Sequence, residues 1–160
     1  MAEKSARPLP GGVLPLHPDG MQLTGFSHVA LSVSDISVSK DFYSQTLGLT
    51  VLDSSPSYCA LLVGGEGLTA LILTSHEGGS REPFDERRPG LDHVSLAVPD
   101  VASLNAWHAK LSAQGVSSDM RKSEWGHHLN FRDPDNIAVE FVVLEPDRET
   151  KDVLGRAGLV

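Results

Sequence analysis

The sequence predicts an α+β fold built from two βαβββ repeats. Two observations carry this prediction. Residues 91–100 (LDHVSLAVPD) repeat the pattern of residues 26–35 (FSHVALSVSD), and each copy is followed by a helical pattern and several short apolar segments. A self-similarity of this size indicates one supersecondary unit that occurs twice. We therefore expect a first unit over residues 24–75, a linker over 76–90 and a second unit over 91–144.

The strands and helices follow from local patterns. Alternation of apolar with polar residues, bounded by glycine or proline, is typical of strands. Strands are expected at residues 26–34, 49–53, 57–63, 68–74, 91–98, 116–121, 127–132 and 137–144. Helices are expected over about residues 37–47 and 101–114, and glycines that typically end helices, Gly48 and Gly115, follow them. Asp35 is a typical N-cap for the first helix.

The apolar positions indicate which faces are buried. The first strand has an apolar face made of Val29, Leu31 and Val33, and the last has one made of Ile137, Val139, Phe141 and Val143. We expect Val38 and Phe42 to pack on the first of these faces. The second helix carries its own apolar stripe, made of Leu104, Trp107 and Leu111. The opposite faces, small and polar, are then expected to line a concave surface between the units.

Charge and composition exclude several classes of partner. A net charge of -8 argues against a nucleic-acid or anionic-membrane surface. No apolar run approaches the roughly 20 residues of a membrane span. The single Cys59 excludes an intramolecular disulfide and fits the reducing cytoplasm. Residues 1–23, rich in proline and glycine and without the apolar core of a signal peptide, are expected to form a flexible arm, and residues 145–160 a charged tail.

A histidine occurs at the same place in both repeats, as His28 and His93, although nothing structural requires it. Glu140 lies in mid-strand between apolar neighbours, where a carboxylate is costly to bury unless it is paired or coordinates a metal. On the predicted alternation all three side chains point away from the helices. Two histidines and one carboxylate are the facial triad that suits Fe(II), and with fewer open positions they suit catalytic Zn. Hydrogen-bonded strand histidines and a solvated glutamate are the simpler alternative.

These features together resemble the vicinal oxygen chelate superfamily, which includes glyoxalase I, extradiol dioxygenases, fosfomycin-resistance proteins and bleomycin-binding proteins. The resemblance covers about residues 24–144 and depends on the doubled βαβββ pattern, the two histidines and the segment 133–140 (DPDNIAVE). It implies that the two units curl into an incomplete barrel around a divalent metal, which binds a substrate through two adjacent oxygens. His28, His93 and Glu140 match three ligand positions of the family.

Three positions depart from particular branches of that superfamily. Ile72 stands where glyoxalase I has a fourth ligand, a carboxylate, and Asn130 stands where the extradiol signature has a tyrosine. Ala30 stands where the fosfomycin enzymes have a threonine. The reaction type therefore stays open between ring-cleaving dioxygenase chemistry and lyase, isomerase or thiol-transferase chemistry.

Strand alternation supplies further candidate residues around the metal. The catalytic candidates are His76, His128 and Asn130, and the candidates for the substrate pocket are Tyr58, Ile72, Trp125 and Arg132. His76 is a candidate acid/base catalyst and is alternatively a surface-loop histidine. Tyr58 and Trp125 alternatively only pack. His127, on the opposite parity, is expected to be exposed.

The sequence thus predicts a metal-dependent enzyme acting on a small molecule, with Fe(II) or Mn favoured and Zn or Ni as alternatives. The alternative function is a metal-free binding module that sequesters a small drug in the same concavity. Unpaired sheet edges and the family resemblance both predict a homodimer. No nucleic-acid or membrane partner is expected.

Overall fold

The computed structural model describes residues 26–64, 69–145, 150–152 and 155. The predicted N-terminal arm and most of the predicted C-terminal tail lie outside these residues. Phe26–Glu145 form one compact unit. Its elements in chain order are β1 (His28–Ser32), α1 (Ile36–Asp41), the π-helical turn η1 (Phe42–Thr46), β2 (Thr50–Ser55), β3 (Tyr58–Val63), β4 (Thr69–Thr74), β5 (Val94–Ala97), α2 (Val101–Ala113), β6 (Ser118–Ser123), β7 (Gly126–Arg132) and β8 (Ala138–Leu144).

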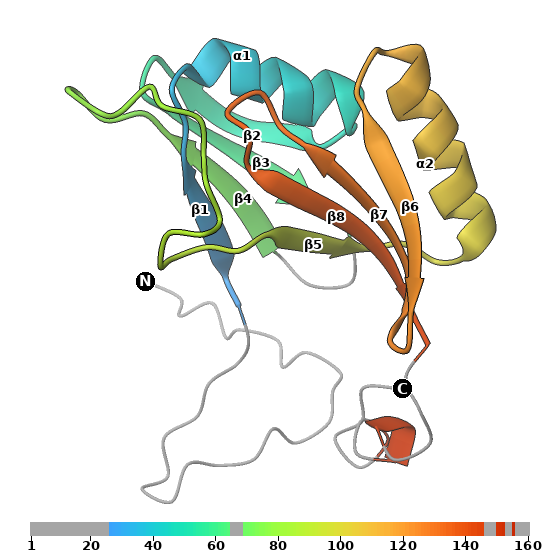
Figure 1. The fold of residues 1–160 in the computed structure, drawn as a ribbon. Coiled ribbons are helices and arrows are strands. Elements are labelled where there is room, and N and C mark those ends of the chain that lie inside the picture. The colour runs from blue at the N-terminus through green and yellow to red at the C-terminus, as the bar shows by residue number, and fades with distance from the viewer. Residues whose placement is uncertain (1–25, 65–68, 146–149, 153–154, 156–160) are drawn as a thin grey trace, which may run out of the picture. The chain divides into compact units, whose positions relative to one another are not determined.

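These strands form two four-stranded sheets of the same topology (Figure 1). The order is β1-β4-β3-β2 in the first sheet and β5-β8-β7-β6 in the second. The first strand of each repeat pairs in parallel with the last, and the remaining pairs are antiparallel. Neither sheet closes on itself. The α+β prediction of two βαβββ repeats is therefore confirmed.

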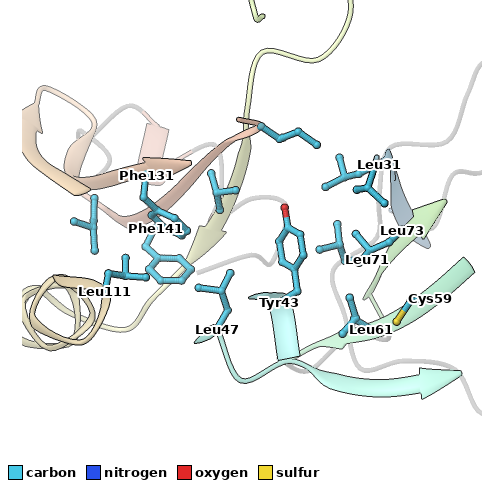
Figure 2. Close-up of a cluster of buried hydrophobic side chains, with 14 of the residues drawn as sticks. Leu31, Tyr43, Leu47, Cys59, Leu61, Leu71, Leu73, Leu111, Phe131 and Phe141 are labelled. Carbon is cyan, nitrogen blue, oxygen red and sulfur yellow. The ribbon is translucent and has the colours of Figure 1, made fainter. Parts of the chain in front are cut away.

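A single hydrophobic core runs through both repeats. Figure 2 shows Tyr43 between the leucines of the first sheet, among them Leu31 and Leu73, and the phenylalanines Phe131 and Phe141 of the second. Burial of each such side chain stabilises the fold by about 1.5–3 kcal/mol relative to its exposure. The predicted apolar faces of the first and last strands all point into this core or pack against it. So does the predicted stripe on α2, in which the Trp107 ring lies 4.9 Å from that of Phe141.

The first helix differs from the prediction in its phase. Val38 does not pack on the first strand, because its side chain is 51% exposed. The buried positions of this segment are Ile36, Ser39, Tyr43 and Leu47. α1 begins with Ile36 in the core, and the helical face that continues from Ile36 excludes Val38. After Asp41 the helix widens into η1, in which the Leu47 N–H donates to the Phe42 carbonyl at 3.2 Å.

The turn before β8 links the two repeats. Asp133, a buried carboxylate, accepts hydrogen bonds from the Tyr43 hydroxyl at 3.0 Å and from the backbone N–H groups of Asp135 and Ile137 at 2.9 and 2.7 Å. Burial raises the pKa of the Asp133 carboxyl, although its hydrogen bonds oppose this shift. Asp135 in turn accepts from the Ser34 N–H at 3.0 Å. These contacts fasten the first repeat to the turn that precedes Glu140.

In the part of the chain that the structure describes, no helix has both the length and the apolar composition needed to cross a membrane.

Candidate functional site

A row of polar side chains crosses the second sheet on one face. Glu140 on β8 is paired with Ser95 on β5 and with Asn130 on β7. Paired residues point to the same face, and so do residues two apart on one strand. The face therefore also carries His128, two residues before Asn130. His93 continues the alternation of β5, although the strand itself begins one residue later, at Val94.

Glu140 is held by two hydrogen bonds, one to each carboxylate oxygen. The Ser95 hydroxyl donates to Oε2 at 2.6 Å, and His128 Nδ1 lies 2.7 Å from Oε1. Only 14% of the Glu140 side chain is exposed, so these bonds offset the cost of removing the carboxylate from water. Because each carboxylate oxygen has its own hydrogen-bond partner, the orientation of the carboxylate is fixed.

The Nε2 atom of His93 faces this carboxylate. Its Nδ1 lies 2.6 Å from Asp92 Oδ1, which can only accept, so Nδ1 carries the hydrogen. In the neutral form of the ring Nε2 then carries no proton, and this atom lies 3.8 Å from Glu140 Oε2. That separation is too long for a hydrogen bond. Two acceptors that face each other in this way favour a cation between them, and a carboxylate behind the histidine is the usual support of a metal-binding imidazole.

Four further predicted site residues lie on the polar and small-residue face of the first sheet. Ile72 on β4 is paired with Ala30 and Ala60, and strand alternation adds His28 on β1 and Tyr58 on β3 to the same face. His28 is exposed, and its Nδ1 lies 2.9 Å from the Ser27 hydroxyl. His76, just after β4, has its Nε2 3.2 Å from the hydroxyl of Ser32 on β1.

The structure thus brings together four predicted residues on the second sheet and four on the first. Among the described residues, no three His, Cys, Asp or Glu side chains lie close enough together to hold a metal ion. Within one chain, His28 therefore does not join His93 and Glu140.

Arg132 and Trp125 are the two remaining predicted pocket residues. Arg132 donates from both terminal nitrogens to Glu86 of the linker, at 2.9 and 2.7 Å, and these bonds hold the pKa of Glu86 at about 2. Arg132 and Asn130 also line a cavity of about 590 Å³. Trp125 is at the turn between β6 and β7 with 54% of its surface exposed, so it packs against little of the described fold.

Sequence reasoning missed three residues that support the site. Asp92 fixes the tautomer of His93. Ser27, at the equivalent position of the first repeat, contacts His28 in the same way. Strand alternation places Ser95 on the face of Glu140, but it does not indicate that the hydroxyl contacts the carboxylate. Ser123, whose hydroxyl lies 2.7 Å from His128 Nε2, had no sequence signal, because its role depends on the β6–β7 register.

Comparisons with known proteins agree with the fold. A family model described as the Glyoxalase/Bleomycin resistance protein/Dioxygenase superfamily matches residues 25–141. A solved glyoxylase/bleomycin resistance protein/dioxygenase domain from Frankia sp. EAN1pec is 32% identical, with a TM-score of 0.70, over 78% of this chain and 100% of that one. TnmS3, an antibiotic binding protein from Streptomyces sp. CB03234, is 25% identical, with a TM-score of 0.61, over 78% of this chain and 99% of that one.

A longer relative comes from Bacillus subtilis (strain 168), where it is named "Putative ring-cleaving dioxygenase MhqA". It is 28% identical over 138 residues, which are 82% of this chain and 43% of the relative. The chain therefore spans less than half the length of that protein.

Proposed function

Because the chain belongs to the glyoxalase/bleomycin resistance protein/dioxygenase superfamily, we propose that it is a metal-dependent enzyme acting on a small substrate that presents two adjacent oxygens. The observation that carries the proposal is the opposition of His93 Nε2 and Glu140 Oε2 at 3.8 Å. The similarity to the B. subtilis protein favours ring-cleaving dioxygenase chemistry on a catechol-like substrate among the reactions of the superfamily.

The residues of the second sheet fit a divalent metal. An imidazole nitrogen and a carboxylate oxygen suit Fe(II) or Mn, and Zn or Ni as alternatives. Asp92 keeps the hydrogen of His93 on Nδ1, so Nε2 is available as a ligand. Ser95 and His128 hold the carboxylate of Glu140 through one contact to each oxygen. A bound metal of this kind would supply Lewis-acid activation and a template for two substrate oxygens.

The third ligand of the proposed site is His28 from a second copy of the chain. His28 is exposed on its own sheet, and its Nε2 is not engaged by the Ser27 contact, which involves Nδ1. Within the described residues β1, β2, β5 and β6 are edge strands with unpaired main-chain groups, and pairing across a two-fold axis removes that liability. In such a dimer the face with Tyr58, Ile72 and His76 would meet the face with Glu140 and enclose the substrate.

Asn130 and His76 would then act on the substrate. Asn130 is the cross-strand neighbour of Glu140 and has an amide that can donate to a substrate oxygen. His76, held by Ser32, is the candidate for moving a proton to or from the substrate.

Calorimetric titration of Mn(II), Fe(II), Co(II), Ni(II) and Zn(II) into metal-free protein tests the proposal. Wild-type protein should bind at least one of these metals, and Glu140→Gln should lose most of the affinity, because it keeps the side-chain volume and removes the charge. His127→Ala is the matched control, since His127 points to the opposite face of β7. Binding that survives unchanged in Glu140→Gln would contradict the proposed site.

A drug-binding module is the second candidate, and the similarity to the antibiotic binding protein TnmS3 favours it. Oxygen uptake in the presence of a catechol panel separates the two functions. Metal-dependent uptake supports the enzyme, whereas tight binding of a small aromatic drug by protein that binds no metal supports the module.

A further inference from the structure

His128 lies between Glu140 and Ser123 and contacts both. Its Nδ1 lies 2.7 Å from Glu140 Oε1, and its Nε2 lies 2.7 Å from the hydroxyl of Ser123. That hydroxyl accepts the Trp125 N–H at 3.0 Å. These contacts hold the ring at both nitrogens. Because only 17% of the side chain is exposed, the ring also has little freedom to turn.

The partners determine which nitrogen donates. The Glu140 carboxylate can only accept, so a ring with its lone pair on Nδ1 would place two acceptors 2.7 Å apart with no hydrogen between them. The Ser123 hydroxyl can either donate or accept, so it can serve Nε2 in both forms of the ring. The Nδ1–H bond to Glu140 is therefore the same whether the imidazole is neutral or charged.

Because of this bond, the two carboxylate oxygens of Glu140 have different surroundings. Oε1 is occupied by His128, whereas Oε2 faces His93 Nε2 at 3.8 Å and accepts from Ser95. Without a donor on Oε1 the carboxylate could rotate about the Cγ–Cδ bond of Glu140, because the Ser95 hydrogen bond holds only Oε2. A rotated carboxylate could also offer both oxygens to one cation.

We infer that His128 is a positioning residue, which holds Glu140 so that the carboxylate offers only Oε2 to a divalent transition-metal ion shared with His93. The inference rests on the proposed function. It implies that Glu140 is a monodentate ligand and that the position a second oxygen would occupy stays open for substrate. His128 thus acts through Glu140 and not on the substrate itself.

A pair of amide substitutions at His128 tests this role. Asparagine places its N–H donor as many bonds from the backbone as Nδ1, whereas glutamine places its donor where Nε2 stands. The two variants are similarly polar, so a structural need for a polar side chain would be met by both. Positioning of Glu140 would be met by His128→Asn alone.

The measurements are Co(II) affinity by calorimetry and the visible spectrum of bound Co(II), which reports its coordination. We expect His128→Gln and His128→Leu to bind Co(II) about 10- to 100-fold more weakly, with an altered spectrum, as is typical when a group supporting a metal ligand is removed. His128→Asn should retain wild-type affinity and spectrum. His127→Leu is the control, since it removes the neighbouring histidine on the opposite face.

Wild-type affinity and an unchanged spectrum in His128→Gln would overturn the positioning role and leave the metal site intact. Equal losses in the Asn and Gln variants would also overturn it. If wild-type protein itself binds no Co(II) or other divalent metal, the proposed function fails and this inference fails with it.

Discussion

The hydroxyl of Tyr43 donates a 3.0 Å hydrogen bond to Oδ2 of Asp133, which lies 90 residues further along the chain. The bond joins the helical segment of the first repeat to the turn that leads into β8, the strand of Glu140. Both groups are buried, so neither can exchange its partner for water without opening the core.

Tyr43→Phe should destabilise the protein by about 1–3 kcal/mol, because it leaves the buried Asp133 carboxylate with one partner fewer. Urea unfolding measures the loss. Val38→Ala is the control, since Val38 is 51% exposed and its truncation should change stability by only about 0.5 kcal/mol or less. Equal stability of Tyr43→Phe and wild type would mean that the hydroxyl contributes nothing to the link between repeats.

Asp133→Asn should change how stability depends on pH. Burial raises the pKa of Asp133 above its ordinary value of 3.8, so the folded state binds its proton more tightly than the unfolded state does. The resulting contribution to stability is present below pH 3.8 and is lost as the pH rises through the folded-state pKa. Measured from acid to neutral pH, the stability of wild type minus that of Asp133→Asn should therefore fall. A difference that rises with pH would show that the hydrogen bonds to Asp133 outweigh its burial.

Gly126→Ala should be among the most damaging small substitutions in β7. Gly126 has φ of 137°, and an added Cβ would clash with the Val143 carbonyl oxygen on β8. We expect a loss of about 3 kcal/mol or more, from backbone strain together with the clash. Gly64→Ala is the control, because an added Cβ at Gly64 meets no atom of the described residues within 4 Å. Thermal unfolding of both variants checks the prediction, and similar melting temperatures would contradict it.

The fold was predictable because its signals are local and occur twice. Period-2 alternation and the capping residues Asp35 and Gly48 place the first strand and helix, and the repeat carries the same assignment to the second unit. The phase of α1 was not predictable, since Tyr43, on the same buried face as Ile36, has its hydrogen-bond partner Asp133 in the second repeat. The η1 turn has no local signal for the same reason.

The candidate site was predictable to the extent that strand alternation determines it. Alternation alone places His128 and Asn130 on the face of Glu140. It does not give the distance between the two sheets, so the sequence leaves open whether His28 joins His93 and Glu140 within one chain or across a dimer. The exposure of Trp125 depends on a turn whose direction the sequence does not encode locally. A cytoplasmic location stays a prediction from the single cysteine.

Ile72→Glu should add a fourth metal ligand to the proposed site. Ile72 lies on the face that carries His28, paired with Ala30 and Ala60, whose small side chains leave room for a longer one. Metal affinity should rise, and any oxygen-dependent turnover should fall, because fewer positions stay open for substrate. Ile72→Gln separates the effect of charge from that of size. Unchanged metal affinity in Ile72→Glu would place Ile72 away from the metal.

The central claim is that one metal site draws His28 from one chain and His93 and Glu140 from another. Two variants, His28→Ala and Glu140→Ala, can be co-expressed with different affinity tags, and the hybrid dimer purified through both tags. Each parent dimer should bind no metal, because both of its sites lack a ligand. The hybrid should hold one intact site of two and therefore about half the wild-type metal content per dimer. Hybrids as free of metal as their parents, in a protein whose wild-type dimer binds it, would contradict the claim.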